Sequence, residues 1–249
     1  MGIIQGLTEF LPVSSTAHLV LLPWFFNWTG DLNTLTFDVA LHSGTLASLL
    51  ICFWRDWIEL ITKKQKLLVI VITAAIPAGI AGFLLNDIVE NSLRSPHIIA
   101  AALIFFGIVM MAAEKIARTR TIDEMSFTDA LVIGTMQAVA LIPGVSRSGI
   151  TISAGLFKGF QREAAARFSF LVSTPLIAGA TLLHARKLLK AGSSHDLSLF
   201  LTGFAAAAVS GYAAIRFLMG YFRRHSLNAF ACYRFCLASV IIAWVWLRN

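Results

Sequence analysis

Charged side chains are scarce in this chain of 249 residues, because aspartate, glutamate, lysine and arginine together make up only 13% of it. An ordinary soluble domain has about a quarter of its residues charged, roughly twice that share. Hydrophobic residues reach 57%, and the mean hydropathy is +0.77. These values exclude an ordinary cytosolic globular domain. Because the apolar excess extends along the whole chain, we predict a single integral membrane domain over residues 1–249.

Cysteine is also scarce, with only Cys52, Cys232 and Cys236. All three lie in apolar runs, and neither their number nor their spacing suits disulfides or a metal site, so we expect buried free thiols. The start of the chain lacks the features of a cleaved signal peptide, and none is expected. The net charge of +7 comes from lysines and arginines clustered between apolar runs. That distribution favours anionic lipid headgroups over nucleic acid as the partner.

Six apolar segments approach the length of about 20 residues that a helix needs to cross the hydrocarbon core. They are residues 37–54, 67–86, 97–113, 164–185, 197–219 and 228–247. Residues 2–26 and 130–157 are also apolar, but proline and several polar side chains interrupt them. Such segments occur at membrane depth only where protein or a water-filled cavity satisfies their backbone. We therefore predict an all-α polytopic membrane protein with six transmembrane helices and two re-entrant helix–loop–helix elements.

The loop charges and an internal repeat give this topology an orientation. If each broken segment returns to the side it entered, most loop cations fall on one side, which should be cytoplasmic. Gln5 and the Val-Ser-Ser-Thr run from residue 13 recur 132 residues later, as Gln137 and the Val-Ser-Arg-Ser run from residue 145. Three spans separate the copies, so the second is inverted. The halves are about residues 1–113 and 128–247, with the two breaks meeting near the midplane.

Two polar side chains interrupt the apolar start of the chain. Gln5 and Glu9 are four residues apart, so they share one face of a helix. A carboxylate exposed to lipid is costly. Two interpretations follow: a polar face turned to the headgroups, or a buried carboxylate that binds a cation, orients a neighbour or exchanges a proton.

Hydroxyl side chains follow at Ser14, Ser15 and Thr16, after Pro12 ends the first helix. They are typical of an N-cap that opens a new helix. His18 lies four residues after Ser14 and three after Ser15, so imidazole and hydroxyl can share one face. A base beside a hydroxyl makes serine nucleophilic. The alternative is a capping serine with an interfacial histidine.

A buried arginine is predicted in the second broken segment. Arg147 lies between Ser146 and Ser148, and Thr151 follows one helical turn later. Backbone N–H groups at a helix start, two hydroxyls and a guanidinium make a receptor for phosphate or diphosphate. The alternative is an arginine that snorkels, or that pairs with a buried carboxylate such as Glu9. Because inversion brings the two breaks together, the pattern predicts phosphoryl chemistry on a lipid-borne anion.

These motifs are similar to those of a known family. Residues 5–18 resemble the first signature of the undecaprenyl-pyrophosphate phosphatases, the bacitracin-resistance family, and residues 143–151 resemble the second. Weaker likenesses lie at residues 37–45 and at Tyr233 and Arg234. The resemblance implies six spans and two re-entrant elements in an inverted repeat. It also implies that the terminal phosphate of undecaprenyl diphosphate is removed, which regenerates the monophosphate carrier for cell-wall synthesis.

The resemblance assigns roles by position. Gln5 and Glu9 match the family's Glu/Gln-x-x-x-Glu motif. Because the side-chain amide of Gln5 cannot act as a base, the roles of both positions fall mainly on Glu9. The implied catalytic residues are Glu9, Ser15, His18 and Arg147. The implied substrate-binding residues are Gln5, Ser14, Thr16, Ser146, Ser148 and Thr151. Glu9 is also the expected ligand of a divalent cation, either Mg²⁺ or Ca²⁺.

The expected mechanism divides the work between the two motifs. Arg147, with the amides and hydroxyls of its flanking serines, holds the diphosphate and neutralises charge as the bond breaks. Ser15, Ser14 or an activated water attacks the terminal phosphorus, and His18 exchanges the proton.

The resemblance places the chain in the bacterial cytoplasmic (inner) membrane and implies a contribution to bacitracin resistance. The expected partners are a polyprenyl diphosphate and membrane lipids, with a homodimer as an open alternative and no nucleic acid. A transporter or lipid flippase is the alternative function, because inverted repeats with broken helices serve transport as well. Members of the family have a longer first helix than the four residues before Gln5 provide, so the resemblance predicts a start further upstream.

Overall fold

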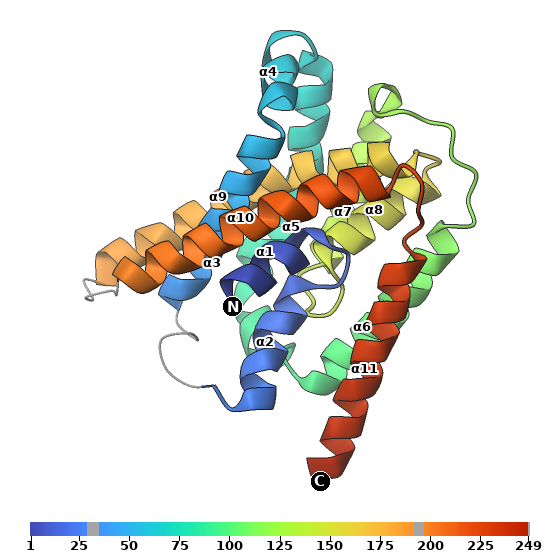
Figure 1. Ribbon diagram of the computed structural model, residues 1–249. Helices are drawn as coiled ribbons and strands as arrows, with labels where there is room; N and C mark the ends of the chain where they lie inside the picture. The colour runs from blue at the N-terminus through green and yellow to red at the C-terminus, as the bar shows by residue number, and fades with distance from the viewer. Residues whose placement is uncertain (29–34, 192–196, 249) are drawn as a thin grey trace.

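The computed structural model describes residues 1–28, 35–191 and 197–248 (Figure 1). Within these residues the chain is helical, with no β-strand beyond one isolated bridge between Arg120 and Phe160. The helices are α1 (Gly2–Phe10), α2 (Ser15–Phe26), α3 (Leu35–Cys52), α4 (Trp54–Thr62), α5 (Gln65–Ser92), α6 (Pro96–Ala113), the 3₁₀ turn η2 (Ile122–Glu124), α7 (Phe127–Val139), α8 (Arg147–Phe157), α9 (Arg162–Ala191), α10 (Leu197–Tyr221) and α11 (Asn228–Arg248). The predicted all-α class is confirmed.

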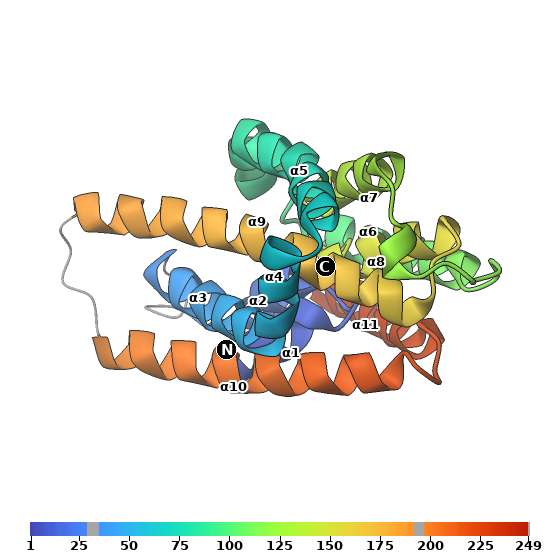
Figure 2. The ribbon, with the colours of Figure 1, turned by 90° about the horizontal axis from the view of Figure 1, so that it is seen from above.

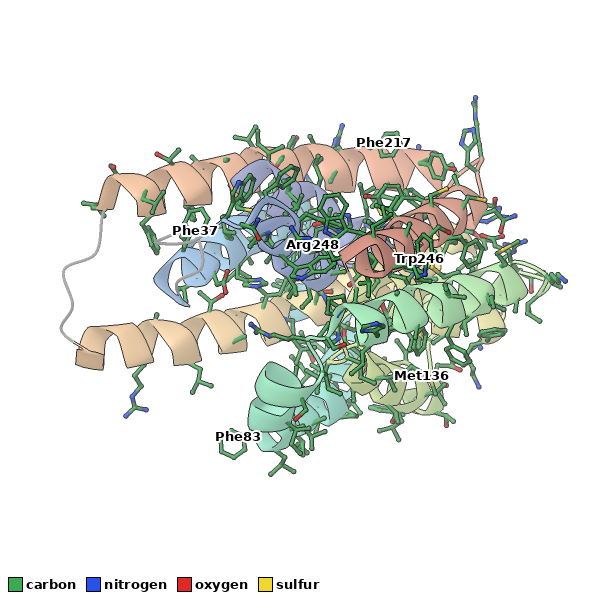
Figure 3. The ribbon with its side chains drawn as sticks, turned by 90° about the horizontal axis from the view of Figure 1, so that it is seen from below. Phe37, Phe83, Met136, Phe217, Trp246 and Arg248 are labelled. Carbon is green, nitrogen blue, oxygen red and sulfur yellow. The ribbon has the colours of Figure 1, made fainter. Side chains whose placement is uncertain are left out.

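Within the described residues, five helices are long and apolar enough to cross a membrane on their own. These candidate spans lie in α5, α6, α9, α10 and α11. The remaining predicted span, residues 37–54, lies mainly in α3. The chain bends by 64° between α3 and α4, and the two helices are long and apolar enough for a span only when taken together. Large apolar side chains such as Phe83, Phe217 and Trp246 point outward from their helices (Figure 3). A surface this apolar suits lipid rather than water, and the chain is a multi-pass membrane protein.

Several helix boundaries differ from the prediction. α5 and α9 run to Ser92 and Ala191, beyond the predicted ends at residues 86 and 185, because a helix that leaves the hydrocarbon core no longer needs apolar residues. α7 begins at Phe127 instead of residue 130. Ser126 and Asp129 form a capping box there, in which the serine oxygen accepts the Asp129 N–H and the carboxylate accepts the Ser126 N–H.

The expectation of buried cysteines is wrong, although the three thiols are free as predicted. Cys232 and Cys236 are exposed on α11, and Cys52 is only partly buried. Only 22% of the apolar window of α11 is buried inside the protein. The other faces of such a helix are open to lipid, so an apolar residue in a span need not be buried in protein.

The two broken elements are found where proline predicted them. α1 and α2 are separated by a turn around Pro12, and α7 and α8 by the residues around Pro143. None of these four helices is long enough to cross the membrane alone: their lengths are 9, 12, 13 and 11 residues. Each element therefore places an irregular turn and two helix ends inside the protein.

Helix boundaries repeat along the chain with the offset of the sequence repeat. α2 and α6 begin at residues 15 and 96, whereas α8 and α11 begin at residues 147 and 228, a shift of 132 in both cases. Packing follows the same relation. α10 packs against α1 and α3, and α5 packs against α7 and α9 (Figure 2). Each half thus contributes a long helix to the other, and the two broken elements lie between them.

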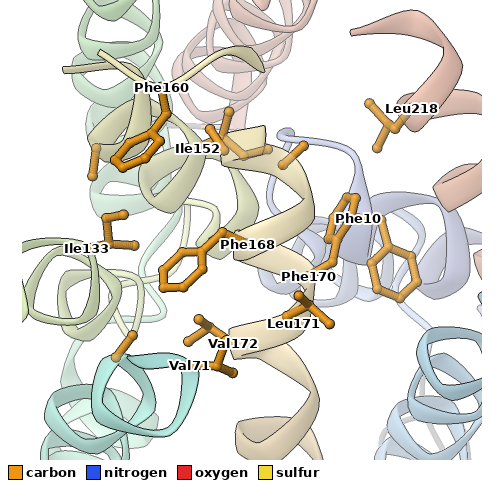
Figure 4. Packing of buried hydrophobic residues seen from close by; sticks show 14 of the residues in the cluster. Phe10, Val71, Ile133, Ile152, Phe160, Phe168, Phe170, Leu171, Val172 and Leu218 are labelled. Carbon is orange, nitrogen blue, oxygen red and sulfur yellow. The ribbon is translucent and has the colours of Figure 1, made fainter. Parts of the chain in front are cut away.

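The largest buried apolar cluster surrounds the broken elements. Phe10 at the end of α1 packs edge-to-face on Phe170 of α9, with ring centroids 5.7 Å apart. Figure 4 shows α9 supplying several of the buried side chains, with Ile152 from α8 and Val71 from α5 around them. Because this cluster holds α1, α8 and α9 together, the turns that follow α1 and precede α8 sit on a rigid base.

Ion pairs join the helix ends outside the spans. Glu114, just after α6, accepts hydrogen bonds from Arg162 Nε at 2.9 Å, from the Leu227 N–H at 2.8 Å and from Arg118. Burial alone would raise the pKa of the Glu114 carboxyl group, but these hydrogen bonds outweigh it and hold that pKa below its ordinary value. One carboxylate therefore links α6, α9 and the turn between α10 and α11.

Candidate active site

The tips of the two broken elements touch. The Gly144 N–H donates to Ser14 Oγ at 3.2 Å, and Ser148 Oγ donates to the Leu11 carbonyl at 3.3 Å. The residues in these contacts are more than 100 positions apart in the chain, so tertiary packing of the two halves creates the contact. This juxtaposition is what the inverted repeat predicted.

A serine with an unusual backbone conformation caps a helix at each tip. Ser14 has φ 74° and Ser146 has φ 72°, values that residues other than glycine rarely adopt. Each side chain caps the helix that follows, Ser14 Oγ accepting the Ala17 N–H and Ser146 Oγ the Gly149 N–H. The first N–H groups of α2 and α8 have no partner within their own helices. Two helix N-termini with spare donors thus begin at the junction, an arrangement that attracts anions.

Glu9 is the centre of the polar contacts at the junction. One carboxylate oxygen accepts Arg147 Nη2 at 2.5 Å, and the other accepts Ser15 Oγ at 2.6 Å and Gln5 Nε2 at 3.0 Å. Only 8% of Glu9 is exposed. The acid of the first tip, the hydroxyl beside it and the arginine of the second tip are therefore one connected group.

His18 does not make its predicted contact with a serine hydroxyl. Its Nδ1 lies 2.7 Å from the Ser14 carbonyl and its Nε2 lies 2.7 Å from the Tyr233 hydroxyl. A carbonyl only accepts, so Nδ1 carries a proton, and in the neutral ring Nε2 accepts from Tyr233. The predicted pairing of imidazole with the hydroxyls of Ser14 or Ser15 is corrected here. Ser15 turns to Glu9 instead, because the first turn of α2 faces the acid across the break.

Two polar atoms at the junction are buried and have no hydrogen-bond partner among the described residues. They are Arg147 Nη1 and Gln5 Oε1. Buried polar atoms almost always have partners, so atoms without one indicate a site for a ligand, water or ion. The guanidinium thus has one terminal nitrogen on Glu9 and a second left for another acceptor.

The remaining predicted binding residues divide into two groups. Ser146 and Ser148 lie at the junction with their hydroxyl oxygens 3.3 Å apart, and Thr16 is exposed on the first turn of α2. Thr151 is 1% exposed, and its hydroxyl contacts the Arg147 carbonyl at 2.8 Å and Ser169 Oγ at 2.6 Å. That places the Thr151 hydroxyl toward α9, where it supports α8, and its contact with substrate stays a prediction.

Three further residues belong to this region. His42 of α3 lies 3.3 Å from Gln5 Nε2 through its Nδ1, and Tyr233 holds His18. Arg234 is fully buried and donates to five backbone carbonyls. Arg234 neither forms an ion pair within the described residues nor reaches the surface. The available signal was an arginine next to a tyrosine in an apolar span with no acid nearby in sequence.

The junction offers oxygen ligands for a divalent cation, but not a complete set of protein ligands. Among the described residues, no three side chains of histidine, cysteine, aspartate or glutamate cluster as metal ligands. Glu9 is the carboxylate at the junction, and the partnerless Gln5 Oε1 belongs to the residue that contacts it. Mg²⁺ is often held by one or two carboxylates together with substrate phosphates, so these residues fit a cation that arrives with its anion.

Comparison with known proteins gives one consistent result. A profile described as "Bacitracin resistance protein BacA" matches residues 1–240. The chain is 54% identical over 249 residues to a protein named undecaprenyl-diphosphatase from Thermodesulfovibrio yellowstonii, with 100% of this chain and 96% of the relative covered. Proteins of the same name from Moorella thermoacetica and Desulforudis audaxviator are 46% and 45% identical, with 100% of this chain and 97% of each relative covered.

Proposed function

The chain belongs to the bacitracin resistance protein family, and on that premise we propose that it is an undecaprenyl-diphosphatase. It converts undecaprenyl diphosphate to undecaprenyl phosphate and inorganic phosphate. The observation that carries this proposal is the chain of contacts from Arg147 through Glu9 to Ser15, which joins an anion-binding cation, a carboxylate and a hydroxyl across the two tips. The names of the relatives favour this activity over the flippase or transporter considered from the repeat alone.

The diphosphate binds where the helices α2 and α8 begin. Their free N–H groups and the spare Nη1 of Arg147 supply donors for phosphate oxygens. Ser146 and Ser148 add hydroxyls, and Thr16 adds one from the opposite tip. The prenyl chain stays in lipid, since the outer faces of the helices are apolar.

Ser15 is the nucleophile in this proposal. Its hydroxyl donates to Glu9 at 2.6 Å, so Glu9 is the group placed to accept the proton as the serine oxygen attacks the terminal phosphorus. The bond from that phosphorus to the bridging oxygen breaks, and undecaprenyl phosphate leaves with the bridging oxygen. Water then attacks the phosphoserine and releases inorganic phosphate. Arg147 neutralises charge on the transferred group in both steps.

His18 has a different part from the one first expected. With Nδ1 on the Ser14 carbonyl and Nε2 on Tyr233, the imidazole supports the turn that presents Ser15. Glu9 therefore takes the role of proton acceptor. A divalent cation would be held by Glu9 and Gln5 Oε1 together with phosphate oxygens, and when bound it would supply further charge neutralisation.

The biological setting follows from the activity. The protein acts in the bacterial cytoplasmic membrane and regenerates the lipid carrier for cell-wall glycans. Removing the diphosphate form also gives resistance to bacitracin. A homodimer and the absence of a nucleic-acid partner stay predictions of the sequence.

Phosphate release in detergent tests the proposal. Purified protein should release inorganic phosphate from farnesyl diphosphate, a soluble prenyl diphosphate, with no membrane to cross. Ser15→Ala should abolish release, whereas Ser239→Ala should not, because Ser239 Oγ donates only to the Phe235 carbonyl on α11. Binding of substrate without any release in the wild-type protein would support a carrier and overturn the phosphatase. Release by Ser15→Ala at the wild-type rate would leave water as the nucleophile.

A further inference from the structure

Arg234 lies inside the protein without an acidic partner. It is 0% exposed, and none of the ion pairs in the described part of the chain involves it. A charged side chain inside a membrane protein is expensive, and an isolated one normally marks a functional need. The groups that the Arg234 side chain contacts indicate its function.

All five contacts of the Arg234 guanidinium are to backbone carbonyls. Nη1 donates to Pro12 O at 3.4 Å and Val145 O at 3.0 Å, and Nη2 donates to Gly144 O at 2.7 Å and Ala102 O at 3.2 Å. Nε donates to Leu103 O at 3.2 Å. An arginine side chain offers five N–H donors in a rigid fork, and here each contact has its own acceptor.

These acceptors belong to three separate elements. Pro12 is in the first tip, Gly144 and Val145 are in the second, and the two remaining acceptors are Ala102 and Leu103 in α6. Irregular backbone at membrane depth needs partners for its carbonyls. Arg234 provides them for both tips at once, so one side chain ties the first tip, the second tip and α6 to α11.

The second tip also lies too close to α6 for any other side chain at its turn. Gly144 has φ +98°, and a Cβ atom there would come within 2.7 Å of the Ile99 carbonyl oxygen. The tip therefore rests against α6 where Arg234 holds it. Val145 and Pro12 lie one and two residues before the capping serines Ser146 and Ser14.

We propose that Arg234 is a positioning residue for phosphoryl transfer. By holding the carbonyls of both tips, it sets the distance between Glu9 on the first tip and Arg147 on the second, and thereby the alignment of Ser15 with the bound diphosphate. The neighbouring Tyr233 contacts the first tip through its hydrogen bond with His18. This inference rests on the proposed phosphatase activity, but the clasp of the tips can be measured without it.

A substitution of Arg234 can separate the effect of its charge from the effect of its geometry. Arg234→Lys keeps the positive charge but loses the planar fork, so it cannot reach carbonyls on three elements. We expect kcat to fall by about a hundredfold, the effect of a small misplacement of reacting groups, and KM for farnesyl diphosphate to change much less. The matched control is Arg216→Lys on α10, because Arg216 is exposed, in contrast to the buried Arg234. Arg234→Gln serves as the second variant if the lysine protein does not fold.

Spin labels give a readout that does not depend on activity. Labels at Phe26→Cys and Phe157→Cys, on the exposed ends of α2 and α8, report how the two helices sit when the three native cysteines are replaced. We expect one narrow distance distribution with Arg234 and a broadened or shifted one in the variants. Normal kcat with an altered distribution would overturn the proposal, and so would a low kcat with an unchanged one. A wild-type protein that holds its tips but releases no phosphate would instead contradict the proposed function.

Discussion

The two tips share a backbone and differ in chemistry. Ser14 and Ser146 have almost the same φ and cap equivalent helices, and Gln5 has its counterpart in Gln137. At the offset of 132 residues, however, Glu9 corresponds to Leu141 and Ser15 to Arg147. The repeat thus supplies two turns of matching backbone. The side chains on them differ, so that one turn carries an acid with a hydroxyl and the other a cation.

Arg147 should be the residue whose loss costs most activity. Arg147→Ala removes the guanidinium that we propose neutralises the transferred phosphate. Arginines in such a role are worth 10³–10⁵ in kcat, so we expect a loss of roughly 10⁴-fold. The measurement is phosphate release from farnesyl diphosphate by protein with an unchanged elution profile. Near-normal turnover would show that the second tip does not bind the anion.

Two carboxylates held by arginines provide the next comparison. Glu9→Gln should lower kcat by about 10³-fold, because the proposed proton acceptor for Ser15 is lost, with little change in thermal stability. Glu114→Gln should do the reverse, since Glu114 joins helix ends away from the junction. Turnover and melting temperature of both variants check this pair. Equal effects on activity would mean that Glu9 acts only as a structural partner of Arg147.

The two glutamines test how far the two halves differ. Gln5 Nε2 donates to Glu9, so Gln5→Leu should lower kcat by roughly tenfold or more. Gln137 is 2% exposed, and both of its side-chain polar atoms lack a partner among the described residues. Gln137→Leu should therefore keep full activity and melt at the same or a higher temperature. A large loss of turnover in Gln137→Leu would contradict this and show that the second half has a functional site of its own.

The smallest effect concerns pH. The hydrogen bonds to Glu114 lower its folded pKa, so its contribution to stability is present above the unfolded value of about 4.3 and is lost as pH falls through the folded pKa. The melting temperature of the wild type should decline as the pH falls below about 5. The decline should be shallower in Glu114→Gln, and parallel curves would contradict the assignment.

Local patterns in the sequence predicted the spans, the two breaks and the meeting of Arg147 with Glu9. Proline and serine mark each break locally, and the repeat supplies the one long-range relation required. The orientation of His18 was beyond such reasoning, because its partner Tyr233 is 215 residues away. The role of Arg234 was hidden for the same reason, since carbonyl acceptors leave no trace in side-chain identity. The contact of Thr151 with Ser169 was hidden as well, because Ser169 lies on a different helix, α9.

The contact between Glu9 and Arg147 can be observed directly in protein labelled at its glutamate carboxyl carbons and arginine guanidinium nitrogens. Solid-state NMR in bilayers should show a carbon–nitrogen correlation for this pair, which disappears in both Glu9→Gln and Arg147→Lys while the correlations of Glu114 persist. If the wild-type spectrum and the two variant spectra contain the same correlations, the acid and the guanidinium do not meet, and the two tips do not form one site.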